Sequence, residues 1–377
     1  MSENFKKIRR RVWLLLNIGV ALWVLLGVLC LQVPPHKFWP AGFIAFSLPG
    51  ALALNILFLF YWLLRRSWFV ALPLALILLG WNYYERLVSI NTADQTPEAG
   101  AKTLQVLSFN THVFNAYADQ DGNVRQASMD MVDWVATHPA DVLCLQEFYS
   151  NRGSSIYNTV NKIGTRYDRY RFFSVSYVDR SKADIGIVIF SKYPITGKGV
   201  IRFGESNHNR AIWTDLNVKG DTIRVYTAHL QSMSIKSQDI ENTYSAIGDK
   251  DTFNKEGRNL ARRLRKGFIA RSNQVEILLE HIRESPYPVI VCGDLNDIPF
   301  SYTYNELAEE LTNAFVEAGT GVGATYNGPL PFLRIDNQFY SKELKAYDFI
   351  THQEMGLSDH YPISAKYEIL PKGAQPQ

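Results

Sequence analysis

Two polar side chains directly follow a short apolar run in the C-terminal part of the chain. Residues 289–292 are apolar, and Gly293, Asp294 and Asn296 come after them. A run of this length predicts a strand buried on both faces, with Asp294 and Asn296 at its C-terminal tip. There an acid can orient a water molecule and an amide can donate to an oxyanion. Taken alone, the same residues also fit a turn in which both side chains bond their own backbone.

Polar residues close other apolar runs in the same way. Asn110 ends residues 104–110, Glu147 ends residues 141–147, His229 ends residues 223–229, and Asp359 and His360 precede an apolar-rich C-terminal segment. In an α/β sandwich the ends of such strands gather at one edge of the sheets. We therefore expect these side chains to lie close to Asp294 and Asn296.

A series of motifs resembles the endonuclease/exonuclease/phosphatase superfamily, which includes DNase-like, exonuclease III-like and sphingomyelinase-like enzymes. The motifs are, in order, FN, LQE, IGIVIFSKYPI, TAHL, GDLND, RIDNQFY and SDHYPI. The resemblance covers residues 103–370. It implies an α/β four-layer sandwich, in which two central mixed β-sheets are flanked by helices, and it implies metal-dependent hydrolysis of phosphoesters.

The resemblance also implies a metal site built from oxygen ligands. Glu147 matches the principal metal carboxylate of the family, Asn110 lies beside it, and Asp359 contributes to the same region. Carboxylate and amide oxygens suit Mg²⁺, with Mn²⁺ as the alternative. The three cysteines give no zinc pattern and are too few for a disulfide framework.

Five further residues match the catalytic positions of the family. Asp294 matches the carboxylate that orients the attacking water, and Asn296 matches an amide that contacts phosphate. His360 matches a catalytic imidazole, and a carboxylate partner at Asp336 would fix which of its ring nitrogens carries the proton. His229 matches a phosphate contact and general acid, although by itself it fits a core histidine equally well.

Charge is unevenly distributed along the chain. The formal net charge is +3, but residues 1–101 hold nine Lys/Arg and four Asp/Glu, which leaves 30 basic and 32 acidic residues for the remainder. Dedicated duplex-DNA binders have a positive footprint. The slightly acidic remainder therefore argues against chromosomal DNA as the substrate.

The N-terminal part predicts a membrane region. Residues 12–33, 41–64 and 68–87 are apolar stretches, each long enough to cross a bilayer as a helix. The alternative is a set of buried core helices. We expect three transmembrane helices within residues 1–90, a polar linker at 91–102, the catalytic domain at 103–370 and a tail at 371–377.

Basic residues predict how this region is oriented. Five of them lie within residues 6–11, and Arg65 and Arg66 lie between the second and third stretches. Because cytoplasmic loops carry an excess of Lys and Arg, both segments are expected in the cytoplasm. Three crossings would then make the chain a multi-pass protein of the cell membrane whose catalytic domain lies outside the cytoplasm.

A second basic segment, residues 258–271, begins a predicted amphipathic helix that continues to residue 284. One interpretation is a solvated helix face. The other is that this helix leans over the site or the membrane and contacts phosphate.

These observations favour a membrane-anchored, divalent-metal-dependent phosphodiesterase. A tether raises the effective concentration of a lipid substrate, so we expect a lipid head group or another non-chromosomal phosphodiester. A DNase-like nuclease is the alternative, and a binding module without chemistry is a remote one, because Glu147, Asp294 and His360 are all present. No obligate protein partner is inferred.

Overall fold

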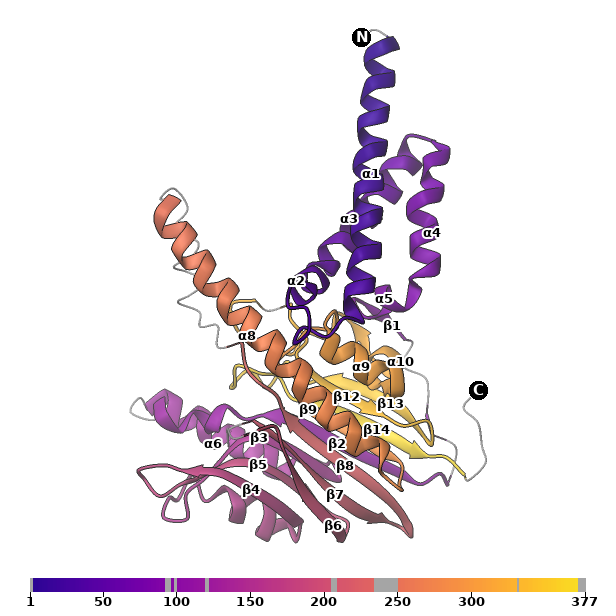
Figure 1. The fold of residues 1–377 in the computed structure, drawn as a ribbon. Coiled ribbons are helices and arrows are strands. Elements are labelled where there is room, and N and C mark those ends of the chain that lie inside the picture. The colour runs from indigo at the N-terminus through magenta and orange to yellow at the C-terminus, as the bar shows by residue number, and fades with distance from the viewer. Residues whose placement is uncertain are drawn as a thin grey trace.

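The computed structural model describes residues 3–91, 96–97, 100–118, 122–204, 209–233, 250–330 and 332–371. A bundle of N-terminal helices rises from one edge of a sandwich of two sheets (Figure 1). Part of the expected linker, and the expected tail after residue 371, lie outside the described residues. The domain boundaries drawn from the sequence stay predictions.

The bundle contains two helices, rather than the expected three, that are long and apolar enough to cross a membrane. Its elements are α1 (Glu3–Leu31), α2 (Pro40–Phe46), α3 (Leu48–Leu64), η1 (Trp68–Val70), α4 (Ala71–Leu79) and α5 (Trp81–Glu85). The two candidate spans are Lys7–Leu31 and Pro40–Leu64.

The third expected span, residues 68–87, is interrupted. Its apolar helix ends at Leu79, and the chain leaves helical geometry at Gly80 before α5 begins. At about 1.5 Å per residue, Trp68–Leu79 extends roughly 18 Å, whereas a bilayer core is roughly 30 Å thick. The expectation of three full-length helices is therefore wrong for this segment.

The sandwich consists of two six-stranded sheets. The first contains, in spatial order, β10 (Thr312–Asn313), β12 (Asp336–Tyr340), β9 (Val289–Asp294), β8 (Asp221–His229), β7 (Arg210–Val218) and β6 (Ile195–Arg202). The second contains β13 (Leu344–Thr351), β14 (Ile363–Ile369), β2 (Thr103–Asn110), β3 (Val142–Ser150), β5 (Asp184–Ser191) and β4 (Tyr170–Val178). Both sheets mix parallel and antiparallel pairs.

Strand β9 shows why residues 289–292 are all apolar. Ile290 and Cys292 pack into the core between the two sheets, whereas Val289 and Val291 pack into the layer on the outer face. Successive side chains of a strand point to opposite faces, so a strand covered on both sides has no polar face. The expectation of a doubly buried strand is confirmed.

Helices cover the outer faces of both sheets. Against the first sheet lie α8 (Lys250–Arg283) and α9 (Tyr302–Glu310), and against the second lies α6 (Gly122–Thr137) with η3 (Val160–Gly164). The remaining short elements are η2 (His112–Ala118), η4 (Thr165–Tyr167), α10 (Ala314–Ala318), and β1 (Ser89–Ile90) paired with β11 (Thr320–Gly321). The expected four-layer sandwich is confirmed.

The base of the bundle packs on the sandwich beside two strand ends. Leu31, Ala45 and Leu48 share one hydrophobic cluster with Phe300, which follows β9, and with Ile335, which precedes β12. The bundle therefore rests next to the strand ends that carry Asp294 and Asp336.

Candidate active site

Register places three of the expected residues side by side in the first sheet. Asp294 is the last residue of β9, and its register partners are Asp336 on antiparallel β12 and His229 on parallel β8. Gly293 allows this close strand packing, because a Cβ at that position would lie 2.0 Å from the carbonyl oxygen of Ala228. Strand pairing alone thus brings together residues that are far apart in the sequence.

A bulge positions the expected metal carboxylate in the second sheet. The pairing of β3 with β5 shifts register between Leu145 and Phe148, and Glu147 within that interval has a φ of 48°. Such a left-handed conformation costs a non-glycine residue roughly 1–3 kcal/mol. A bulge redirects a side chain out of the regular alternation. The strain is thus associated with aiming Glu147 at the edge of the sheet.

Asn110 connects the two sheets. It ends β2, and its Nδ2 donates to Asp294 Oδ2 at 3.1 Å and to Glu147 Oε1 at 3.4 Å, while its Oδ1 accepts from the backbone N–H of His112 at 3.1 Å. His229 Nε2 lies 3.7 Å from both Glu147 Oε1 and Asp294 Oδ2. The site therefore lies between the sheets, with carboxylates contributed by both.

The turn after β9 holds Asp294 in place. Its Oδ1 accepts from the backbone N–H of Asn296 at 2.8 Å, and its Oδ2 accepts from Asn296 Nδ2 at 3.0 Å. Asn296 has a φ of 51°, and its Nδ2 also donates to the carbonyl of Leu230 at 3.0 Å. The local Asp/Asn turn considered from the sequence is thus present, and it lies inside the site.

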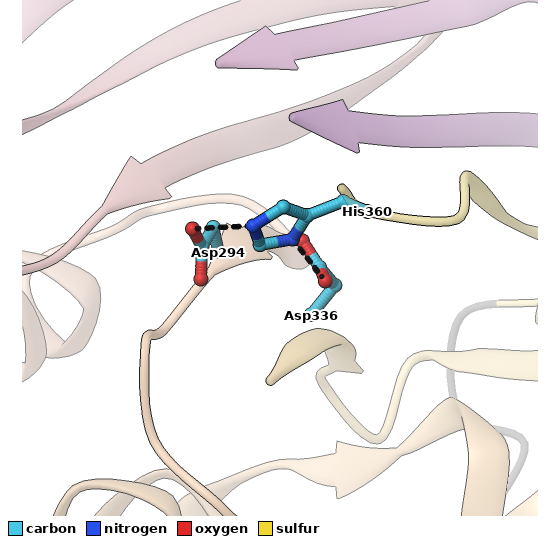
Figure 2. Close-up of side chains that lie close together, drawn as sticks. All are labelled: Asp294, Asp336 and His360. Carbon is cyan, nitrogen blue, oxygen red and sulfur yellow. Dashed lines mark hydrogen bonds and ion pairs between the residues drawn. The ribbon is translucent and has the colours of Figure 1, made fainter. Parts of the chain in front are cut away.

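His360 lies between two buried carboxylates (Figure 2). Its Nδ1 is 2.8 Å from Asp336 Oδ2, and its Nε2 is 3.8 Å from Asp294 Oδ2. Burial alone would lower the pKa of His360, but Asp336 and Asp294 outweigh that effect and raise the pKa to about 10. The imidazole is therefore held as a cation at neutral pH, with both ring nitrogens as donors.

A pocket of about 170 Å³ opens over these residues. Seven of the eight expected residues line it: Asn110, Glu147, His229, Asp294, Asn296, Asp359 and His360. The eighth, Asp336, reaches the pocket through His360. The Glu147 and Asp359 side chains are 34% and 39% exposed, so these carboxylates remain open to a ligand.

Comparison with known sequence families decides the classification. The sequence model of the endonuclease/exonuclease/phosphatase family matches residues 107–360, which is more than half of the chain. The chain belongs to the endonuclease/exonuclease/phosphatase family. A second model, for a domain of unknown function, matches residues 10–87. No protein with a curated function matches the chain.

Solved structures of the endonuclease/exonuclease/phosphatase family share the fold. The protein from Beutenbergia cavernae has 18% identity and a TM-score of 0.51, over 73% of this chain and 74% of that one. The proteins from Bacteroides thetaiotaomicron and Bacteroides vulgatus each have 15% identity and a TM-score of 0.50, over 71% of this chain and 98% and 99% of theirs. At these identities the likeness concerns the fold alone.

Endonuclease/exonuclease/phosphatase enzymes hydrolyse phosphoester bonds and typically use divalent metals. The donors present fit such an ion, because Glu147 and Asp359 offer partly exposed oxygen ligands in one pocket. Asn110 is different, since its amide nitrogen points to Glu147 and its oxygen accepts from His112. In this orientation Asn110 bridges the carboxylates of Glu147 and Asp294.

A second group could also coordinate an ion by distance alone. One ligand atom each from Asp294, Asp336 and His360 lie within 4.8 Å of one another. However, His360 Nδ1 is already hydrogen-bonded to Asp336, and all three residues are at most 5% exposed. The carboxylates of Glu147 and Asp359, at 34% and 39% exposed, are more accessible to an ion than this buried group.

Arg271 supports the site through contacts that the sequence did not predict. Arg271 belongs to the basic segment 258–271, for which the sequence allows either a solvated face or a contact with phosphate, and its side chain is 0% exposed. Its Nε donates to Asp297 Oδ2 at 2.8 Å, and its Nη1 donates to the carbonyl of Gln231 at 2.9 Å. Arg271 thus joins the turn after β9 to the loop after β8. Asp297, which immediately follows the Asp-x-Asn turn, was the available signal for a buried cation near the site. The sequence did not indicate that Arg271 is that cation.

Arg271→Met should destabilise the protein markedly. It leaves the buried carboxylate of Asp297 without its cation, and breaking a buried ion pair from one side costs roughly 3–5 kcal/mol. For a domain of this size we expect the Tm in detergent to fall by roughly 6–20 °C. The double variant Arg271→Met/Asp297→Asn should recover part of this loss. A Tm equal to that of the unmodified protein would show that the pair does not support the two loops.

Proposed function

We propose that the chain is a membrane-anchored, divalent-metal-dependent phosphodiesterase whose substrate is a lipid head group. One observation carries this proposal. Ile335, Leu333 and Tyr326 line the catalytic pocket and also pack in the hydrophobic cluster that includes Leu31 and Leu48 at the base of the bundle. One wall of the pocket is thus continuous with the helices that could span a membrane.

In this proposal Glu147 and Asp359 would hold the divalent metal, which would supply charge neutralisation for the phosphate. Asp294, whose carboxylate accepts from Asn110 and from Asn296, orients the attacking water. His360, held as a cation by Asp336, donates to a phosphate oxygen and stabilises its developing charge. His229 contacts the phosphate and protonates the leaving oxygen.

Two pockets meet at Glu147 and His229, which suits a diester with two unlike substituents. The first is walled by Tyr326, Leu333 and Ile335 on the side of the bundle. The second, of about 260 Å³, includes Ser176, Tyr177 and Arg210. A lipid phosphodiester would direct its apolar part to the first pocket and its polar head to the second.

The distribution of cations supports a catalytic domain outside the cytoplasm. Lys7, Arg9, Arg10, Arg65 and Arg66 surround one pocket near the N-terminus. That end of the bundle lies away from the sandwich (Figure 1). By the positive-inside rule it faces the cytoplasm. The segment from Ser67 to Glu85, although broken at Gly80, then returns the chain to the catalytic side.

Hydrolysis by the full chain in detergent–lipid micelles tests the function. We expect turnover with Mg²⁺, loss of turnover with EDTA, and strong reduction in Asp294→Asn and His360→Ala. The substrates are sphingomyelin, phosphatidylinositol phosphates, plasmid DNA, RNA and bis-(p-nitrophenyl) phosphate. Cleavage of the nucleic acids but not of the lipids would replace the proposal with a nuclease.

Reporter fusions test the orientation. A fusion after Leu64 should report the cytoplasm, and a fusion after Ala101 should report the opposite side. A cytoplasmic signal from the second fusion would contradict the extracytoplasmic assignment.

A further inference from the structure

Helix α8 continues beyond the sandwich as a basic segment. Its C-terminal half packs on the first sheet through Val275, Leu278 and Leu279, whereas its N-terminal half projects from the sandwich on the same side as the bundle and diverges from it (Figure 1). Residues 255–266 contain six Lys/Arg and one Glu. Five of these cations are exposed: Lys255, Arg258, Arg262, Arg265 and Lys266. We call residues 255–266 the basic arm.

The C-terminal end of the basic arm contacts the base of the helical bundle. The Arg265 guanidinium lies 4.7 Å from the ring of Trp39, just before α2. One turn later, Phe268 packs against Phe43 and Phe46 of α2, with ring centroids 5.3 and 5.9 Å apart. These contacts fix where the arm leaves the sandwich relative to the bundle.

The same region carries the aromatic residues typical of a membrane interface. Phe38 and Trp39, between α1 and α2, are 53% and 41% exposed. An exposed Trp at a helix end, such as Trp39, is typical of the level of the lipid head groups. Because Arg265 stacks on Trp39, the exposed cations of the arm begin at that level.

We propose that the basic arm binds the anionic head groups of the leaflet that faces the catalytic domain. This inference rests on the proposed membrane anchoring of the bundle. Each Lys or Arg near an anionic leaflet raises the binding constant for that leaflet by roughly five-fold. Nucleic acid is less favoured as the partner, because residues 102–377 as a whole carry more acidic than basic side chains and Arg265 of the arm packs on Trp39 of the apolar bundle.

The arm would also hold the catalytic pocket at the bilayer. Four residues after Phe268, Ser272 accepts from the backbone N–H of His36 at 3.2 Å, and the neighbouring Arg271 bonds Asp297 beside the site. A helix anchored in head groups at its N-terminal end and tied to the catalytic loops near its middle restricts how far the pocket can tilt from the surface.

A fluorophore on the arm can test the contact in the full chain. Ala261 is exposed, and the three native cysteines are buried, so Ala261→Cys directs labelling to the arm. Lys219→Cys labels the hairpin at the opposite end of β8 from His229 and serves as the reference position. Both proteins are placed in nanodiscs of phosphatidylcholine, with or without phosphatidylglycerol, that contain a head-group nitroxide quencher.

We expect quenching at position 261 to exceed that at 219 and to increase with phosphatidylglycerol. Adding Lys255→Gln, Arg258→Gln and Lys266→Gln should lower the affinity of the arm for the anionic lipid by roughly five-fold per charge removed. The matched control in the Ala261→Cys protein removes three charges at exposed positions away from the arm, through Arg166→Gln, Lys219→Gln and Lys342→Gln. Quenching at position 261 should be unchanged in this control. Hydrolysis of bis-(p-nitrophenyl) phosphate should be equal in all of these proteins.

Equal quenching at the two positions, in protein that co-purifies with the nanodiscs, would assign the arm to a solvated helix face. This result would overturn the lipid contact of the arm but not the anchoring of the bundle. A response at 261 to a DNA oligonucleotide but not to phosphatidylglycerol would replace lipid with nucleic acid. Protein that fails to associate with nanodiscs would overturn both the anchoring and the arm. Absence of hydrolysis in the unmodified protein would instead count against the proposed activity.

Discussion

Asp294→Asn should lower kcat by roughly 10²–10⁴-fold, which is the range of a lost general base. The carboxylate is central to the site: it accepts from Asn110 and Asn296, and it lies 3.7 Å from His229 and 3.8 Å from His360. An amide of the same shape keeps the turn but removes the negative charge that orients water. Single-turnover hydrolysis of bis-(p-nitrophenyl) phosphate measures the effect.

Asp348→Asn is the matched control, because Asp348 forms an exposed ion pair with Lys366 on β14 and does not line the catalytic pocket. Its turnover should equal that of the unmodified protein. If Asp294→Asn retained full kcat with an unchanged circular dichroism spectrum, the carboxylate would have no role in activating water.

Glu147→Gln should weaken binding of the divalent metal and lower activity with it. Loss of an outer partner of a metal site typically costs roughly 10–100-fold in affinity, and loss of a direct carboxylate ligand should cost at least as much. The change is isosteric, so the bulge that aims residue 147 is retained. Titration with Mn²⁺, followed by the electron paramagnetic resonance signal of the free ion, measures affinity independently of turnover.

Glu343→Gln, in the turn between β12 and β13, removes an exposed acid at the opposite end of β12 from Asp336. Its Mn²⁺ affinity should match that of the unmodified protein. If Glu147→Gln bound Mn²⁺ normally and Asp336→Asn did not, the metal would belong to the group of Asp294, Asp336 and His360.

Much of the sandwich could be predicted because its strands carry local signals. Apolar runs such as residues 289–292 and 223–229 mark buried strands, and the polar residue that ends each run marks the edge of a sheet. This pattern was sufficient to name Asn110, Glu147, His229 and Asp294 as neighbours. The order of the motifs then indicated the family, which the match over residues 107–360 confirms.

Local pattern was less informative in the N-terminal region. Hydropathy over residues 68–87 is high enough for a transmembrane helix, but the structure breaks that helix at Gly80. Hydropathy averages over a window, whereas helix continuity depends on single residues and on packing. Asn55 in α3, for example, donates to the carbonyl of Pro73 and to the hydroxyl of Tyr84 on either side of the break.

By itself, the sequence determined which strands are buried and which polar residues end them, because burial on both faces requires a continuous run of apolar neighbours. Only the tertiary structure decided that Glu147 lies in a bulge, that Asp336 pairs with Asp294, that Arg271 is buried against Asp297, and that one wall of the catalytic pocket packs against the base of the bundle. These features depend on strand register and on helix docking. Both are set by contacts between residues far apart in the chain, and such contacts leave no local pattern in the sequence.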